Sequence, residues 1–313
     1  MTATVTSNAS GKGPAGKGPA GKTSAGQRAA RQAAAQQALA AQARIRRRRM
    51  LLSVFLPVIV VVVVVLVFVV VKTTSSKPAP VAAVPTGAAG PALEKALASI
   101  PAATFDSVGA GSDVVAPKAI EGAPLTADGK PRVLYVGAEY CPYCAGERWA
   151  VVAALSRFGT FSQLGTTTSA AADVFPSTAT LSFHGATYTS SLLSFTGVEV
   201  TTNIPNAGNS GYTPLDTLTA ADQQIATTYN SAGSIPFVDF GNRYAIVGAS
   251  YDVGLLQGLT QTQIAAQLAD PGTATAKGVL GAANMMTAAL CKMTKGQPAA
   301  VCSSTAVTTA TLP

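Results

Sequence analysis

Apolar residues form one long run near the start of the chain and shorter, spaced groups after it. Residues 50–71 contain no charged side chain. At about 1.5 Å per residue, a helix of this length spans the roughly 30 Å hydrocarbon core of a bilayer. The run therefore predicts a transmembrane helix. A cleaved signal peptide is the competing interpretation, but the run is longer than the apolar part of such a peptide.

Beyond that run, the pattern alternates between the short period of strands and the longer period of helices. Residues 133–136 are uniformly apolar and predict a buried strand. Residues 147–155 have helical spacing, and Gly159 behind them is a candidate C-cap. Further helices are predicted at residues 91–100, 218–229 (with Thr217 or Thr219 as N-cap), 261–269 and 274–291.

Segments rich in β-branched and aromatic residues predict further strands. They lie at residues 114–120, 180–183, 186–188, 193–200, 237–240 and 244–247, and Pro117 assigns the first of them to a sheet edge. Residues 203–214 are rich in Asn, Gly and Pro and predict a loop. Strands and helices that alternate along the chain indicate an α/β fold.

The positive charge of the chain is confined to its first residues. The chain has a net charge of +8, yet residues 1–49 hold ten Lys and Arg and no acidic residue. The remainder holds twelve Lys and Arg against fourteen Asp and Glu. A nucleic-acid-binding domain is therefore not expected. A repeated Gly-Lys-Gly-Pro-Ala unit predicts that residues 1–49 are disordered.

The arginines before the apolar run set its expected orientation. Five arginines, Arg44 and Arg46 to Arg49, lie directly before the run, whereas only Lys72 and Lys77 follow it closely. By the positive-inside rule, the basic tail is cytoplasmic and everything after Lys72 lies outside the cell. The sequence therefore predicts a single-pass protein of the cell membrane. The Ser-, Pro- and Ala-rich residues 73–90 are expected to be an extended tether.

A Cys-x-x-Cys motif follows the strand predicted at residues 133–136. Cys141 and Cys144 lie where the next helix begins. Free N–H groups at a helix N-terminus stabilise a thiolate, so Cys141 is expected to be a nucleophile at neutral pH. Cys144, one turn deeper, is expected to resolve the mixed disulfide that Cys141 forms. The motif alone is a weak signal, because zinc sites share it.

Two segments resemble the thioredoxin superfamily. Residues 138–144, Ala-Glu-Tyr-Cys-Pro-Tyr-Cys, are similar to its Ala-Glu-Trp-Cys-x-x-Cys segment, with a glutaredoxin-like Pro-Tyr between the cysteines. Residues 233–244 resemble its Ile-Pro strand and the hairpin that follows. The resemblance covers roughly residues 119–270. The surroundings of the motif look most similar to a membrane-anchored, actinobacterial-type thioredoxin-like family without an assigned function.

The resemblance implies a thioredoxin-like mixed sheet, in which the strand ending at Val136 runs parallel to one neighbour and the later hairpin is antiparallel. It implies a thiol–disulfide oxidoreductase that acts on extracytoplasmic protein thiols through the dithiol, and a second membrane protein that could recycle it. Substrate contacts are implied for Tyr140, Pro142, Tyr143, Ile235 and Pro236, the last with a cis peptide bond. No cofactor and no metal are implied.

The chain is accordingly expected to have five parts. They are a disordered basic tail (residues 1–49), a transmembrane helix (50–71), a tether and lead-in (72–118), a thioredoxin-like domain (119–271) with an enlarged insert at about 160–230, and a C-terminal helical extension with a disulfide (272–313).

Some residues depart from the thioredoxin pattern. Aligned on the cysteines, Tyr135 replaces the buried aspartate that assists proton removal from the second cysteine. A phenol with a pKa of about 10 cannot accept the proton of the second cysteine at neutral pH. An oxidant, an isomerase or a specialised thiol-delivery role is thereby favoured over a reductant. Glu139 and Glu147 are expected to be solvated. Trp149 is expected in the core, and His184, the only histidine, in an exposed turn.

Cys291 and Cys302 are expected to form a structural disulfide, because the domain is predicted to lie outside the cell. Four cysteines allow three pairings, and two alternatives stay open. One is a zinc site made by all four thiols, for which the spacing is poor. The other is a relay in which this pair exchanges electrons with Cys141 and Cys144.

A binding or scaffold module is the alternative from another functional class. In it the domain docks a membrane or envelope partner, and Cys141 and Cys144 form only a structural disulfide. The redox potential separates the two hypotheses, because structural disulfides typically lie below about −300 mV and catalytic ones lie higher.

Overall fold

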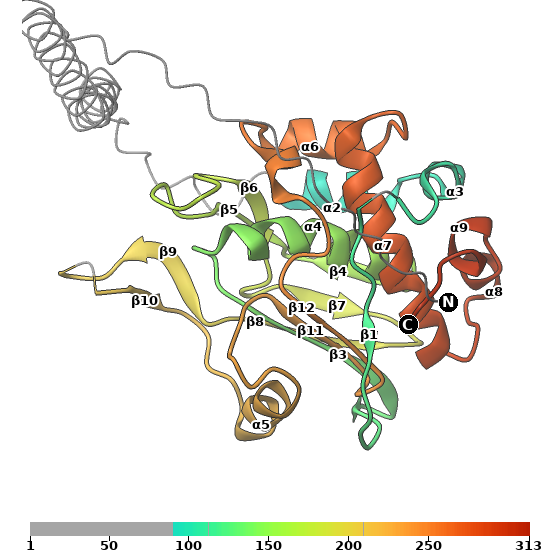
Figure 1. The fold of residues 1–313 in the computed structure, drawn as a ribbon, viewed down its shortest axis with the longest axis horizontal. Coiled ribbons are helices and arrows are strands. Elements are labelled where there is room, and N and C mark those ends of the chain that lie inside the picture. The colour runs from blue at the N-terminus through green and yellow to red at the C-terminus, as the bar shows by residue number, and fades with distance from the viewer. Residues whose placement is uncertain (1–89, 112, 209) are drawn as a thin grey trace, which may run out of the picture. The chain divides into compact units, whose positions relative to one another are not determined.

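The computed structural model describes residues 90–111, 113–208 and 210–313. A six-stranded mixed sheet lies at their centre, in the order β1-β12-β11-β3-β2, with β8 also paired to β3 (Figure 1). β3 runs parallel to β8 and antiparallel to β11, and β11 forms a hairpin with β12, so the predicted mixed sheet is confirmed. The strands are β1 (Lys118–Ala119), β2 (Thr126–Ala127), β3 (Lys130–Gly137), β8 (Ser194–Glu199), β11 (Phe237–Phe240) and β12 (Tyr244–Val247).

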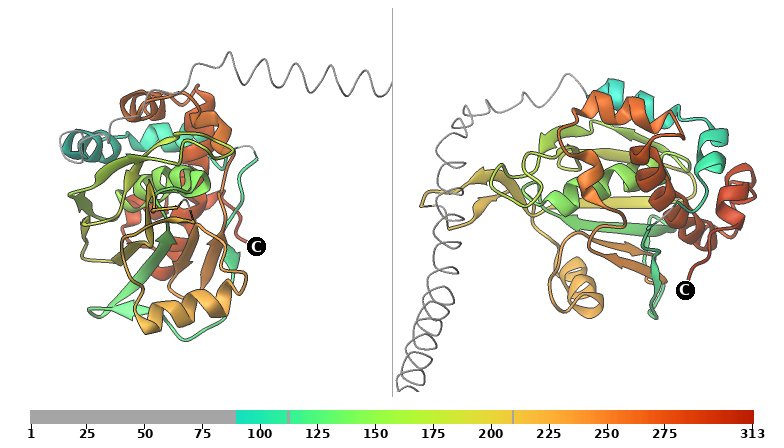
Figure 2. Two further views of the ribbon diagram at one scale, coloured as in Figure 1. Left: turned by 90° about the vertical axis from the view of Figure 1, so that its left-hand side faces the viewer. Right: turned by 45° about the horizontal axis from the view of Figure 1, so that its top comes forward.

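Helices cover both faces of the central sheet. Figures 1 and 2 show α4, α6 and α7 on one side of it and α5 on the other. The helices predicted around residues 91–100, 218–229, 261–269 and 274–291 are confirmed, and Thr219 is the N-cap of α5. The helices are α2 (Gly90–Ala98), α3 (Ala102–Val108), α4 (Pro142–Leu155), α5 (Ala220–Tyr229), α6 (Gln261–Leu268), α7 (Ala274–Met293), α8 (Ala299–Cys302), α9 (Thr305–Thr308) and the 3-10 helix η1 (Val253–Leu256).

Side chains of β3 alternate between two cores. Val133 and Tyr135 lie in the larger core, which α4 and α7 complete. Leu134 and Val136 lie in a smaller core that includes Ala226 of α5. Because both faces of the strand are buried, its sequence is apolar without alternation.

Three two-stranded sheets flank the central sheet within the described ranges: β4 (Thr160–Ser162) with β7 (Thr187–Thr189), β5 (Gly165–Thr168) with β6 (Ala179–Ser182), and β9 (Thr201–Pro205) with β10 (Tyr212–Pro214). The predicted loop at residues 203–214 is therefore wrong. Asn203 lies within β9, whereas Asn206, Gly208 and Gly211 lie between β9 and β10. β8 lies within the stretch 160–230, yet it pairs with β3, so this part of the stretch belongs to the central sheet.

Two element ends differ from the prediction. α4 ends at Leu155 with Ser156 as its C-cap, so Gly159 does not cap it. The edge strand predicted at residues 114–120 is reduced to β1, which pairs with β12 only after Pro117. Proline has no N–H to donate to a neighbouring strand, which accounts for the late start.

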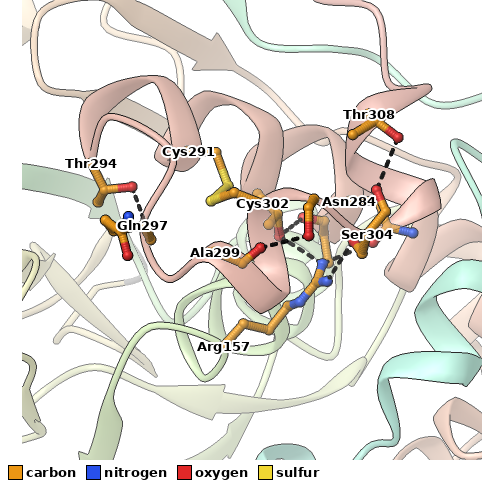
Figure 3. Close-up of a disulfide and its surroundings, with 12 residues drawn as sticks. Arg157, Asn284, Cys291, Thr294, Gln297, Ala299, Cys302, Ser304 and Thr308 are labelled. Atoms are coloured by element: carbon orange, nitrogen blue, oxygen red, sulfur yellow. Dashed lines mark hydrogen bonds between the residues drawn. A yellow bond between two sulfur atoms is a disulfide. The ribbon is translucent and has the colours of Figure 1, made fainter.

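The C-terminal extension packs against α4 in the larger core, and Arg157, two residues after α4, adds polar contacts to it. Arg157 donates hydrogen bonds to Asn284 of α7 at 3.0 Å and to Ser304 before α9 at 3.4 Å (Figure 3). The predicted disulfide between Cys291 and Cys302 is confirmed, and it ties the end of α7 to α8.

The predicted basic tail (1–49), the predicted transmembrane helix (50–71) and the tether up to residue 89 lie outside the described residues. Between residues 90 and 313, apart from 112 and 209, no helix has the length and hydropathy that crossing a membrane requires.

Candidate functional site

Cys141 lies between β3 and α4 and is the N-cap residue of α4. Its φ of −75° and ψ of 122° are extended, and its sulfur accepts a hydrogen bond from the Cys144 N–H at 3.3 Å. Pro142 takes the first helical position, where its missing N–H costs nothing. The sulfur of Cys141 therefore lies at the positive end of the α4 dipole, where a thiolate is stabilised.

The two thiols of the motif have opposite pKa shifts. Hydrogen bonds from the Cys144 thiol and from the backbone N–H groups of Cys144 and Tyr143 lower the pKa of Cys141, against the effect of its burial. Cys144 is 0% exposed, and burial raises its pKa well above the ordinary value. Cys141 is thus the thiol that ionises first, whereas the buried Cys144 keeps its proton.

The Ile235–Pro236 segment lies against Cys141. The Cys141 thiol donates to the Ile235 carbonyl oxygen over 3.8 Å, although 94 positions separate the two residues. The Ile235–Pro236 peptide bond is cis. β11 begins directly after Pro236 and pairs with β3, which leads to the motif, so the sheet brings the two segments together.

A cavity of about 320 Å³ opens beside Ile235, whose carbonyl oxygen accepts the hydrogen bond from the Cys141 thiol. Tyr143 and Ile235 line it together with Phe175, Tyr251 and Val253. Tyr143 is 44% exposed, and its ring meets that of Phe175 edge to face, with 6.0 Å between centroids. The cavity thus has largely apolar, aromatic walls, and two near neighbours of Cys141, Tyr143 and Ile235, belong to them.

The other residues predicted to contact a substrate lie elsewhere around the motif. Tyr140 stacks on Tyr212 of β10, with ring centroids 4.3 Å apart and planes 6° from parallel. It packs the β9–β10 hairpin against the motif. Pro142 and Pro236 are buried. Tyr143 and Ile235 are therefore the predicted residues that the structure brings to the cavity wall.

A buried ion pair near the motif is a feature that sequence reasoning missed. Arg148 and Glu199 are both 0% exposed. The guanidinium donates two hydrogen bonds, of 2.7 and 2.6 Å, to the carboxylate. Short bidentate bonds of this kind are typical of an ionised pair. Burial alone would lower the pKa of Arg148, but Glu199 raises it well above the ordinary value, so the cation persists.

Tyr135 is buried in the larger core, with its hydroxyl group beside Gly137. A Cβ atom at position 137 would lie 2.3 Å from that hydroxyl oxygen, so only glycine leaves room for it. Burial raises the pKa of Tyr135 well above its ordinary value. The hydroxyl therefore keeps its proton at neutral pH, as expected for this replacement of aspartate.

The prediction that Glu147 is solvated is wrong. Its side chain is 0% exposed and accepts hydrogen bonds from the N–H and the hydroxyl of Ser250, at 2.8 and 2.7 Å. Burial raises the pKa of Glu147 to about 7. Trp149 is in the core as predicted, and its indole N–H donates to the Ala179 carbonyl oxygen at 3.1 Å.

One signal in the sequence could have revealed these buried charges. α4 has apolar residues on all sides rather than on one stripe, and every residue from Cys144 to Leu155 is buried. A helix that is apolar all round has no polar face for its charged residues. Glu147 and Arg148 therefore had to find buried partners.

His184 is an exposed turn residue, as predicted. Its side chain is 50% exposed, and its Nδ1 lies 2.6 Å from a carboxylate oxygen of Asp216. Cys291 and Cys302 are joined to each other, so they do not share a metal with the free thiols of Cys141 and Cys144. Across the part of the chain that the structure describes, no three His, Cys, Asp or Glu residues gather as a metal ion would require.

A comparison with protein families places most of this architecture in one family. The model described as Domain of unknown function (DUF929) matches residues 117–292. No curated protein and no solved structure matches the chain. The matched residues comprise the central sheet, the Cys141–Cys144 motif, the Ile235–Pro236 segment and nearly all of α7. The chain belongs to the DUF929 family.

Proposed function

We propose that this protein is a membrane-anchored, extracytoplasmic thiol–disulfide oxidoreductase with a thioredoxin-like fold. The observation that carries the proposal is the asymmetry of the two thiols. Cys141 caps α4, accepts the Cys144 N–H and has a lowered pKa, while Cys144 is buried behind it with a raised pKa. A nucleophilic thiol in front of a protected resolving thiol is the arrangement that disulfide exchange needs.

The proposed reaction is a two-step exchange. The Cys141 thiolate attacks one sulfur of a substrate disulfide, a bond forms between the two sulfur atoms, and the other substrate sulfur leaves as a thiolate. Cys144 then loses its proton to solvent and attacks Cys141. The Cys141–Cys144 disulfide forms, and the first substrate sulfur leaves. The substrate gains two electrons that the dithiol loses, and the reverse sequence oxidises a substrate dithiol.

The proposed substrates are thiols or disulfides of extracytoplasmic proteins. Tyr143 and Ile235, two near neighbours of Cys141, line the cavity in which a substrate segment would lie during attack. Tyr140 stacks on Tyr212 instead, and Pro142 and Pro236 are buried. A membrane protein with its own dithiol or disulfide would return the pair to its starting state.

The proposed location rests on the sequence before the described residues. Residues 50–71 would cross the membrane, with the arginine-rich tail in the cytoplasm and the domain outside. Protease added to intact cells should then digest the domain and leave the tail. Protection of the domain under these conditions would reverse the proposed orientation.

The proposal is tested by trapping substrates in cells with Cys144→Ala. Without the resolving thiol, mixed disulfides on Cys141 should persist and appear as cross-linked species that a reductant dissolves. Cys141→Ala in the same background should abolish them, because the nucleophile is gone. If neither variant shows cross-linked species, the alternative of a non-catalytic scaffold with a structural disulfide would be favoured.

A further inference from the structure

The buried ion pair of Arg148 and Glu199 takes no part in the exchange steps, yet its cation shares the Ala138 carbonyl oxygen with the Cys141 N–H. We propose that Arg148, oriented by Glu199, is a positioning residue that stabilises negative charge on Cys141 and Cys144 and so sets how oxidising the dithiol is. The inference rests on the proposed function, because it concerns the same pair of thiols.

Arg148 reaches the motif from within the same helix. It follows Cys144 by four residues, a spacing at which helical side chains lie one above the other. Its guanidinium donates to the Ala138 carbonyl oxygen at 2.8 Å. The same oxygen accepts the Cys141 N–H at 3.2 Å. One peptide carbonyl thus connects the cation to the N-cap residue of α4.

Glu199 holds the cation there from the sheet. It is the last residue of β8 and the register partner of Gly137, where β3 ends and the chain turns toward the motif. Its two short bonds to Arg148 fix the guanidinium plane. The Nη1 of Arg148 is buried and finds no hydrogen-bond partner among the described residues. A buried cation with an unused donor favours additional negative charge nearby.

Among the residues that the structure describes, the other titratable groups around the site supply no competing positive charge. They are Tyr135 of β3, Glu139 and Tyr140 before α4, Glu147 of α4, Asp173, Glu199 of β8 and Tyr212 of β10. Tyr135 and Tyr140 have raised pKa values because burial disfavours the phenolate. Glu147 is bonded to Ser250. Arg148 lowers the pKa of both Cys141 and Cys144.

A cation beside the dithiol affects its reduced and oxidised forms differently, because only the reduced form can carry negative charge. Thiolates exist only in the reduced dithiol, so a cation that stabilises them lowers the free energy of the reduced form and makes the disulfide more oxidising. A cation also eases proton loss from Cys144 without accepting the proton. The missing buried carboxylate at Tyr135 is then no obstacle to resolution.

Two variants of the full-length chain test the role of Arg148, because they should shift the pKa of Cys141 in opposite directions. Arg148→Met with Glu199→Gln removes both charges, so the pKa of Cys141 should rise. The equilibrium constant for reduction of the disulfide by glutathione should fall about tenfold, or ~30 mV. Glu199→Gln alone leaves the cation without its counter-ion, so the pKa should fall and the constant should rise. The pKa is read from the pH dependence of Cys141 alkylation and of thiolate absorbance.

A matched ion pair lies at the other end of β3. Arg132 and Asp222 are 2.7 Å apart, and Arg132→Met with Asp222→Asn should change neither readout. A purely structural role for Arg148 predicts lower stability with unchanged pKa and equilibrium constant in both test variants, and this result would overturn the inference. If circular dichroism shows that one variant does not fold, the direction of the change in Cys141 pKa and in equilibrium constant in the other variant decides. A wild-type dithiol that glutathione never reduces would overturn the proposed function as well.

Discussion

At the scale of single residues, the chemistry of the site depends on which polar groups α4 carries into the core. Cys141 is the N-cap residue and is 5% exposed, whereas Cys144, Glu147 and Arg148 are 0% exposed. The cost of burying each of these polar groups is offset in a different way. Cys144 stays protonated, Arg148 pairs with Glu199, and Glu147 accepts two hydrogen bonds from Ser250. A buried polar group without such a partner would cost about 1–3 kcal/mol.

The raised pKa of Glu147 predicts a pH-dependent stability. Burial raises this pKa from 4.5 to about 7, so the folded chain binds the proton more tightly than the unfolded chain. Between these two values the free energy of unfolding should fall as pH rises, by on the order of 3 kcal/mol. Glu147→Gln cannot titrate and should remove most of this fall, as measured by denaturant unfolding across the pH range.

Asp239 provides the control for that experiment. It lies in β11, and burial raises its pKa from 3.8 to about 6. Asp239→Asn should therefore flatten only the lower part of the same pH range. If Glu147→Gln shows the full wild-type fall up to pH 7, the carboxyl group at position 147 is not the one that titrates there.

At the scale of elements, the parts that could be predicted are those with a local pattern. A pattern within a short stretch of sequence predicts each of these elements: the strand at residues 133–136, the hairpin of β11 and β12, and the helices α5, α6 and α7. The Cys-x-x-Cys motif likewise lies at the helix start that its neighbours predict.

The parts that sequence reasoning missed depend on contacts between distant segments. Glu199 is 51 positions from Arg148, and the pair forms only because β8 lies beside β3. β9 and β10 are three to five residues long and contain Pro205 and Pro214, so composition favoured a loop. Burial of Glu147 depends on the segment after β12, which packs against α4 through Ser250 and Tyr251.

The disulfide is an element-scale feature with its own prediction. Cys291 and Cys302 are 11 positions apart, and closing so short a loop stabilises the fold by roughly 2.5–3 kcal/mol on a loop-entropy estimate. Replacing both with Ser should lower the melting temperature while the redox potential of Cys141 and Cys144 stays unchanged. Loss of disulfide exchange without loss of stability would instead support a relay between the two pairs.

At the scale of the whole molecule, the proposed redox domain is a sheet with its reactive end built from three separated segments. The motif follows β3, the Ile235–Pro236 segment precedes β11, and Glu199 ends β8. These segments meet because β3 pairs with both β8 and β11 in the central sheet. The family match spans the same region, from residue 117 to residue 292, and therefore includes every part of the proposed site.

The central claim is that Cys141 and Cys144 form a working redox pair. An equilibrium titration of the full-length chain in glutathione buffers, with alkylation of Cys141 as the readout, measures this directly. We expect a potential between about −270 mV, as in thioredoxin, and about −120 mV, as in strong oxidants. The pKa of Cys141 should lie below the unperturbed value of about 8.5. A pair that stays oxidised in every buffer, with an unreactive Cys141 once it is forced open, would contradict the account.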